Sequence, residues 1–130
     1  MVLEFGVDRG TSLRWLAKLF APAGRAVHGF DSFEGLPEDW GALYPAGTFD
    51  NAKRAPRGLP ANAVVHAGWF DDTLPPFLDA RRRADPRARA AFVHVDCDLY
   101  SSAKGVLRAL ARRGFLRPGP VKIPQRTFVD

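Results

Sequence analysis

Carboxylates stand at the ends of apolar runs in this sequence, where they could bind a ligand. Glu4 ends the first run and Asp31 ends the second. Asp96 ends the last run, and Asp98 lies two residues further on. Carboxylates accept hydrogen bonds from hydroxyl groups, pair with cations and hold hard metal ions. Which of these roles they could take depends on the elements that carry them.

The segment 2–12 (Val-Leu-Glu-Phe-Gly-Val-Asp-Arg-Gly-Thr-Ser) predicts a strand, a tight turn and a helix. Gly6 and Gly10 let the backbone turn sharply and approach a ligand closely. Thr11 or Ser12 is expected to cap the helix, whose free N–H groups favour an anionic group. The apolar residues expected along this helix are Leu13, Trp15, Leu16 and Phe20. This unit is typical of nucleotide-binding α/β folds, although a βα turn of another α/β protein also fits it.

Charges in the turn distinguish between possible ligands. A dinucleotide would place a pyrophosphate here, and Glu4 and Asp8 would repel it. A ligand with an ammonium and a sulfonium group would be attracted instead, with its own carboxylate at the helix N-terminus. S-adenosylmethionine carries this set of charges. The sequence therefore favours S-adenosylmethionine over NAD as the cofactor.

Asp31 ends a second expected strand, over 25–31, about 20 residues beyond the glycine turn. Nucleotide-binding folds place there the carboxylate that accepts the ribose hydroxyls. A surface Asp in a loop is the alternative, because Asp is common after strands. The loop that follows, 32–60, is rich in Gly, Pro and aromatic residues and is interpreted as a lid or binding loop, or else as disordered.

Two further strands are expected over 62–68 and 90–96. The second is a continuous apolar run of the kind that is buried on both faces of a parallel sheet. A helix capped by Asp72 or Thr73 should lie between them, and another helix should begin at Ser101. This alternation predicts an α/β fold, a Rossmann-like, doubly wound parallel sheet that binds ligands at the carboxyl ends of its strands.

Size and composition indicate one globular domain. The 130 residues, 46% of them hydrophobic, can form a core but are few for a complete doubly wound sheet. There is no apolar run near about 18 residues and no signal peptide, so a cytoplasmic protein without membrane contact is expected. The single Cys97 agrees with a reducing compartment and is expected to be a packing residue. The three histidines fall inside expected strands without the spacing of a zinc site, which indicates core positions.

The net charge of +5 raises the question of a nucleic-acid partner. The dense basic cluster consists of Arg81, Arg82, Arg83, Arg87 and Arg89. It falls at the end of an expected helix and in the following loop, where cations complement the helix dipole and face solvent. A nucleic-acid partner is therefore not expected.

Four segments carry a more specific signal. They are Leu-Glu-Phe-Gly-Val (3–7), Gly-Phe-Asp-Ser-Phe-Glu-Gly-Leu-Pro (29–37), Gly-Trp-Phe-Asp-Asp-Thr-Leu-Pro (68–75) and His-Val-Asp-Cys-Asp-Leu-Tyr-Ser-Ser (94–102). Together they resemble the macrocin O-methyltransferase family over residues 2–113. The resemblance implies a class I S-adenosylmethionine-dependent fold, in a mostly bacterial family of which many members methylate sugar hydroxyls on natural products.

The resemblance also implies roles for matching residues. The implied cofactor-binding residues are Glu4, Gly6, Gly10, Asp31, Ser32, Trp69 and Phe70. Glu4 and Gly6 would face the methionine end of the cofactor, and Asp31 would face the ribose. Trp69 and Phe70 would lie near the adenine.

By the same resemblance, Asp96 would be the catalytic carboxylate beside the acceptor hydroxyl, and Asp96 and Asp98 would bind Mg²⁺. A metal suits the chemistry because an alcohol is a poor nucleophile until a cation and a base make its proton easier to lose. The family usually completes this site with an acidic pair after a fifth strand, where this chain has Ile123-Pro-Gln-Arg126. The metal site is therefore expected to be incomplete and methyl transfer to be weak or absent. Residues 118–130 are interpreted as a divergent tail of a single partial domain over 1–130.

Three functions remain open. The leading one is O-methyl transfer to a small-molecule hydroxyl acceptor. A nucleic-acid methyltransferase is suggested by the positive charge, but Asp96-Cys-Asp-Leu is not the Asn/Asp-Pro-Pro-aromatic motif of enzymes that methylate base amino groups. The third is a non-catalytic cofactor-binding remnant, whose uncovered strand edge would favour pairing with another chain, for example in a homo-oligomer.

Overall fold

The structure is a computed structural model in which residues 1–116 are described. The elements in chain order are β1 (Val2–Phe5), α1 (Thr11–Phe20), the short 3-10 helix η1 (Ala21–Ala23), β2 (Val27–Asp31), β3 (Ala63–Ala67), α2 (Phe70–Ala84), β4 (Phe92–Val95) and α3 (Tyr100–Arg112). The segment in which a fifth strand or the tail Ile123–Arg126 would fall lies outside the described residues. Within residues 1–116, no helix is both long and apolar enough to cross a membrane.

The strands form one parallel sheet in the order β3-β2-β1-β4. Because β1 pairs with β2 on one side and with β4 on the other, successive connections run in opposite directions from β1. This reversal is the topological switch point at which open α/β sheets bind ligands. The predicted Rossmann-like, doubly wound parallel sheet is confirmed.

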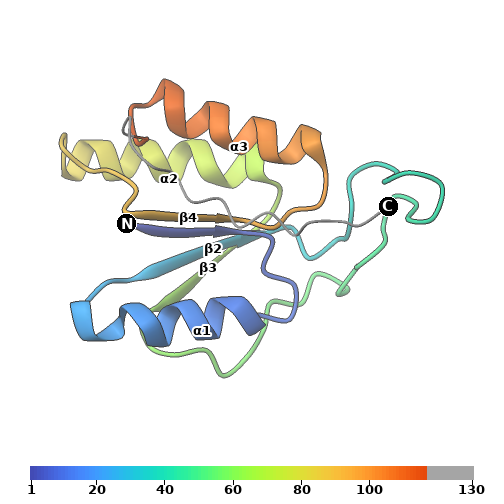
Figure 1. Ribbon diagram of the computed structural model, residues 1–130, viewed down its shortest axis with the longest axis horizontal. Helices are drawn as coiled ribbons and strands as arrows, with labels where there is room; N and C mark the ends of the chain where they lie inside the picture. The colour runs from blue at the N-terminus through green and yellow to red at the C-terminus, as the bar shows by residue number, and fades with distance from the viewer. Residues whose placement is uncertain (117–130) are drawn as a thin grey trace.

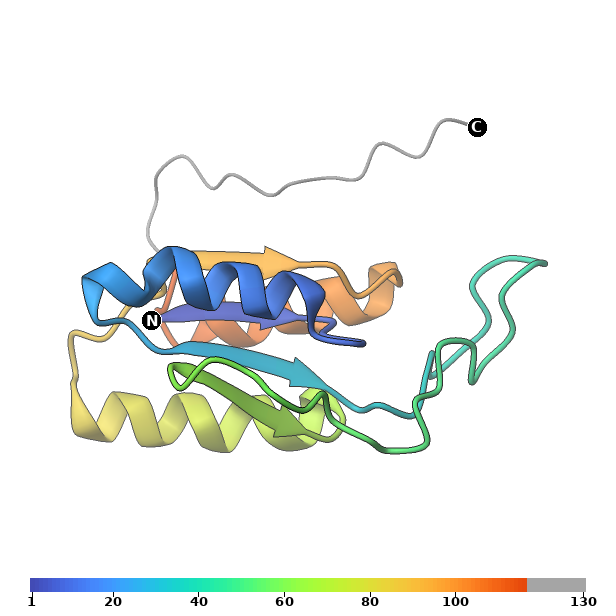
Figure 2. The ribbon, with the colours of Figure 1, turned by 90° about the horizontal axis from the view of Figure 1, so that it is seen from below.

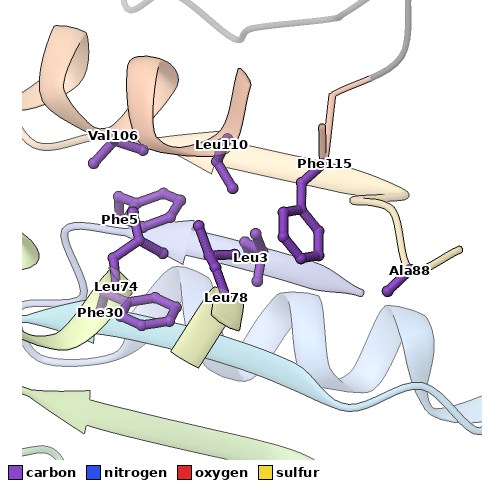
Figure 3. Close-up of a cluster of buried hydrophobic side chains, with 9 residues drawn as sticks. All are labelled: Leu3, Phe5, Phe30, Leu74, Leu78, Ala88, Val106, Leu110 and Phe115. Carbon is purple, nitrogen blue, oxygen red and sulfur yellow. The ribbon is translucent and has the colours of Figure 1, made fainter. Parts of the chain in front are cut away.

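Helices cover both faces of the sheet, with α1 on one face and α2 and α3 on the other (Figure 1). Successive side chains of β1 point to opposite faces of the sheet. Leu3 and Phe5 belong to the hydrophobic cluster under α2 and α3, and Val2 belongs to the cluster under α1. Figure 3 shows the first cluster, in which Leu74 and Leu78 of α2 and the α3 side chains lie around Phe5 and Leu3.

The fourth strand differs from the prediction. β4 pairs only with β1 among the described strands, and its four residues are half-buried rather than buried on both faces. Its continuous apolar sequence predicted a strand buried on both faces, but the sequence of one strand does not determine how much of it the other elements cover.

Two predicted helix starts are also wrong. α1 begins after Gly10, which has φ 77° and lies in the left-handed region, and neither Thr11 nor Ser12 caps it. α2 begins at Phe70 after the extended Trp69, upstream of the predicted caps, and has no side-chain cap. In both cases the backbone geometry of the turn sets the start, and local capping residues do not reveal that geometry.

The long loop between β2 and β3 is ordered by its own hydrogen bonds. The Leu36 N–H donates to the carbonyl of Thr48 at 2.9 Å, and the Gly47 N–H donates back to the carbonyl of Leu36 at 2.9 Å. Further out, the Trp40 N–H donates to the carbonyl of Tyr44 at 2.7 Å. The loop therefore projects as a folded arm beyond the carboxyl ends of the strands (Figures 1 and 2). The disordered alternative is therefore wrong, and the role of the loop as a lid or binding loop stays a prediction.

Candidate functional site

A cavity of about 760 Å³ lies at the carboxyl ends of the strands, at the switch point. The glycine turn, the start of α1, the arm and the segments that follow β2, β3 and β4 all contribute to it. Seven of the predicted site residues line the cavity: Gly6, Asp31, Ser32, Trp69, Phe70, Asp96 and Asp98. Glu4 and Gly10, the other two predicted site residues, do not line it.

Gly6 holds the turn against the end of β4. Its φ is 89°, and a Cβ added to it would lie 2.0 Å from the carbonyl oxygen of Asp96. Only glycine permits this approach, because any side chain would overlap backbone that cannot move aside. The turn after β1 and the carboxylate after β4 are therefore positioned by one backbone contact.

Asp31 fastens the same turn from the other side. Its Oδ2 accepts hydrogen bonds from the N–H groups of Val7 at 2.7 Å and Asp8 at 2.9 Å, and its Oδ1 accepts one from Phe33 at 2.8 Å. A carboxylate has about four acceptor positions, so three backbone bonds leave capacity for a ligand. Asp31 thus lines the cavity and fixes the backbone of the turn at the same time.

The arm is attached to the glycine turn by side chains. Asn51 Nδ2 donates to Asp8 Oδ1 at 2.8 Å, and Asp8 itself has a left-handed φ of 47°. The guanidinium of Arg14 donates to the carbonyls of Arg9 and Arg57, each at 2.7 Å. The arm is therefore attached to the glycine turn by hydrogen bonds from Asn51 and Arg14.

Gly10 contributes to this attachment and not to the cavity surface. A Cβ at Gly10 would lie 2.9 Å from Cγ of Pro56 in the arm. The absent side chain lets the arm pack on the turn. Gly10 is buried and does not line the cavity. Its direct contact with a cofactor stays a prediction.

Glu4 is fully buried and contacts His94 on the neighbouring strand. Its Oε1 lies 3.0 Å from Nδ1 of His94, while Oε2 has no hydrogen-bond partner within the described structure. The bond to Glu4 is the main cause that raises the pKa of His94 above its ordinary value of 6.5. Glu4 thus lies one layer below the cavity, and its contact with the methionine end of a cofactor stays a prediction.

Asp96 and Asp98 both lie on the rim of the cavity and are exposed. Asp98 has a left-handed φ of 59°, which turns the chain sharply before α3. Among residues 1–116 there is no group of three or more His, Cys, Asp or Glu side chains that could hold a metal ion. Two exposed carboxylates would bind Mg²⁺ only weakly, so the described residues do not by themselves fit a magnesium centre.

Sequence reasoning missed several residues of the cavity. Trp15 was expected among the apolar residues of α1, but it is 62% exposed and lines the cavity. Its spacing from Leu13 and Leu16 places it off the buried stripe of the helix, which is the signal that could have identified it. Phe49 of the arm also lines the cavity, and no sequence pattern pointed to it.

Cys97 was expected to be a packing residue, yet it too borders the cavity. Burial raises the pKa of its thiol to about 12. The group is therefore a neutral thiol near neutral pH and has none of the thiolate character that nucleophilic cysteines need.

An open parallel α/β sheet with a cavity at its switch point, bounded by a glycine turn, is the architecture of the doubly wound α/β class. Residues 3–121 match the methyltransferase-domain family, and the chain belongs to that family. Membership of the macrocin O-methyltransferase family in particular stays a prediction.

Two solved structures are similar to this chain. One is CalS11, a calicheamicin methyltransferase, with 25% sequence identity and a TM-score of 0.66 over 86% of this chain and 52% of that chain. The other is the O-methyltransferase NovP, with 25% identity and a TM-score of 0.56 over 86% of this chain and 51% of that chain. The chain therefore spans about half the length of each. A comparison with curated proteins finds no match.

Proposed function

We propose that this chain binds S-adenosylmethionine and transfers its methyl group to a hydroxyl of a small molecule. The observation that carries the proposal is the cavity at the switch point, which Asp31 and Asp96 line together with the glycine turn. Membership of the methyltransferase-domain family supports the cofactor, and the likeness to CalS11 and NovP supports a natural product as acceptor.

In this proposal different residues of the cavity contact different parts of the cofactor. Asp31 accepts hydrogen bonds from the ribose hydroxyls with the acceptor positions that the backbone leaves free. Trp69 and Phe70, at the carboxyl end of β3, lie against the adenine. The Gly6 turn approaches the methionine end, where Asp8 attracts the ammonium group.

When bound, the cofactor supplies an electrophilic methyl group on a sulfonium. Transfer forms a bond between the acceptor oxygen and the methyl carbon, breaks the bond from that carbon to sulfur and releases the hydroxyl proton. As the new bond forms, this proton becomes strongly acidic, so that a carboxylate can accept it. Asp96 orients the acceptor hydroxyl and takes the proton.

No step of this mechanism passes through Mg²⁺. Asp96 and Asp98 are the two carboxylates that would touch such an ion, and the described residues add no third ligand of the kind that would hold it. Because metal assistance would lower the barrier for an alcohol, we expect turnover well below about 1 s⁻¹.

Calorimetry tests cofactor binding, with S-adenosylmethionine and NAD as alternative ligands. Tighter binding of S-adenosylmethionine is expected, because Asp8 would repel a pyrophosphate. Tighter binding of NAD would overturn the assignment.

Transfer of a labelled methyl group to a panel of glycosylated hydroxyl acceptors tests catalysis, with Asp96→Asn as the inactive control. A chain that binds the cofactor but transfers nothing would be a cofactor-binding protein only.

The place of Trp69 is tested separately by fluorescence. A variant with Trp15→Phe and Trp40→Phe retains Trp69 as its one tryptophan, since the chain has three. Its emission should change when S-adenosylmethionine is added, because stacking on adenine alters the environment of the indole. An unchanged signal at saturating ligand would place Trp69 away from the adenine.

A further inference from the structure

Two aromatic residues of the cavity have no part in the proposed contacts with the cofactor. They are Trp15 of α1 and Phe49 of the arm, and both line the cavity. Trp15 is 62% exposed and Phe49 is 51% exposed, so that much of each side chain is open to a ligand. Flat apolar rings of this kind pack well against another aromatic ring.

Phe49 is held in an uncommon backbone conformation. Its φ is 68°, in the left-handed region that costs a bulky residue energy. Half of its side chain stays exposed, so burial of the ring does not offset this cost. The ring of Phe49 also stacks on that of Tyr44, with the two centroids 6.0 Å apart, which holds it in place. Strain of this kind is typical of ligand-binding positions.

The two rings belong to walls of the cavity that the structure joins. The guanidinium of Arg14 in α1 donates to the carbonyl of Arg57 in the arm at 2.7 Å. Leu36 and Pro37 of the arm add apolar surface to the same cavity. The cavity therefore presents a preformed apolar and aromatic surface that comes from both α1 and the arm.

The carboxylates of this chain limit which kind of hydroxyl group can react. Asp96 and Asp98 are exposed, and two such carboxylates hold Mg²⁺ only weakly. Residues 1–116 contain no group of three or more His, Cys, Asp or Glu side chains that could hold a metal ion. In the sequence, residues 117–130 add a single acidic residue, Asp130. This set of ligands favours an acceptor whose hydroxyl reacts without the help of a metal ion.

Phenols and aliphatic alcohols differ in how easily they lose a proton. The ordinary pKa of a phenol is about 10, as for tyrosine, whereas that of an aliphatic hydroxyl lies near the value of water, about 16. A phenol is therefore about 10⁶-fold more acidic. A carboxylate can accept its proton during methyl transfer without a cation on the oxygen.

We infer that the acceptor is a phenol, whose aromatic ring packs against Trp15 and Phe49 while its hydroxyl meets Asp96. The inference rests on the proposed function and names the substrate class of the same cavity. In the reaction a bond forms between the phenolic oxygen and the methyl carbon, and the bond from that carbon to sulfur breaks. The proton of the hydroxyl passes to the carboxylate of Asp96, which releases it to solvent. The products are an aryl methyl ether and S-adenosylhomocysteine.

Transfer of a labelled methyl group to phenol, benzyl alcohol and methyl α-D-glucopyranoside tests the substrate class in the full chain. Benzyl alcohol is the matched control, because it keeps the aromatic ring but carries an aliphatic hydroxyl. We expect kcat/KM for phenol to exceed that for benzyl alcohol by at least about 100-fold, since only part of the difference in acidity is expressed in the transition state. The rate with phenol should be the same in EDTA as in Mg²⁺. A rate that EDTA abolishes and Mg²⁺ restores would overturn the inference.

An NMR titration of the chain loaded with S-adenosylhomocysteine measures phenol binding apart from catalysis. Trp15→Ala should raise the Kd of phenol about fivefold, as the loss of one aromatic contact predicts, and Trp15→Phe should retain most of the affinity. Leu19→Ala is the matched control, because Leu19 is 54% exposed on the same helix and does not line the cavity. No change in Trp15→Ala, or an equal change in Leu19→Ala, would refute the placement of the acceptor ring.

The outcomes separate this inference from the proposed function. Calorimetry should give the same S-adenosylmethionine affinity for the original chain and for Trp15→Ala. A chain that binds no cofactor, or that binds it and methylates none of the three acceptors, contradicts the proposed function. A chain that methylates benzyl alcohol or the glucoside as fast as phenol contradicts the phenol inference alone.

Discussion

The backbone of Gly6 lies against the carbonyl of Asp96, so closely that an added Cβ would stand 2.0 Å from that oxygen. This contact joins the end of β1 to the end of β4 across the switch point. It sets the spacing between the turn proposed to approach the cofactor and the carboxylate proposed to meet the acceptor.

Gly6→Ala should therefore both destabilise the fold and abolish cofactor binding. Left-handed strain and overlap with backbone should lower the free energy of unfolding by about 2–4 kcal/mol in urea titrations. Gly24→Ala is the control, because Gly24 has φ 62° with no atom within 4 Å of the added Cβ. It should show the strain alone, about 1–2 kcal/mol, with unchanged binding. Equal effects of the two substitutions would refute the role of the Asp96 contact.

Asp31→Ala should lower stability even without ligand. It leaves three backbone N–H groups without their acceptor and should cost about 2–3 kcal/mol in the free energy of unfolding. Asp39→Ala removes a carboxylate that accepts one exposed backbone bond and should cost less than about 1 kcal/mol. If Asp31→Ala weakened cofactor binding with no loss of stability in urea, the fastening of the turn by Asp31 would be wrong.

The buried contact of His94 with Glu4 predicts a stability term that depends on pH. Because the folded pKa of His94 is raised above 6.5, the protonated form is favoured in the folded chain. The resulting stabilisation is fully present below pH 6.5 and is lost as the pH rises through the folded pKa. Glu4→Gln should remove this term and return the NMR titration of His94 toward its ordinary value. An unchanged titration would show that Glu4 is not the cause.

The pKa of a second histidine, His28, is shifted in the opposite direction, so that its contribution to stability depends on pH with the opposite sign. Nδ1 of His28 lies 3.1 Å from Nε2 of His66, and burial, followed by the charge of His66, lowers the pKa of His28 to about 4. The unfolded chain takes up this proton more readily, so stability falls as the pH drops from 6.5 toward 4. His28→Phe should reduce the loss of unfolding free energy over this range. A loss of the same size in His28→Phe would assign the acid sensitivity to other groups.

The order of the elements could be predicted from the sequence because its signals are local. Apolar runs, glycines and the acids that end each run lie within a few residues of one another, and parallel strands bring their carboxyl ends to one edge. That geometry places Gly6, Asp31 and Asp96 around one cavity whatever the details of packing. The fold predicted in this way is confirmed. Of the nine predicted site residues, seven line the cavity, and their roles stay predictions.

The tertiary structure decided which side chains reach the cavity surface and which lie beneath it. The side chain of Glu4 is buried against His94 of β4, and Gly10 packs on Pro56 of the arm. Both contacts depend on partners that are distant in sequence. Phe49 reaches the cavity for the same reason, since the arm folds back on the glycine turn. A pattern within one segment reports the periodicity of that segment, whereas burial and contact depend on the other segments that pack against it.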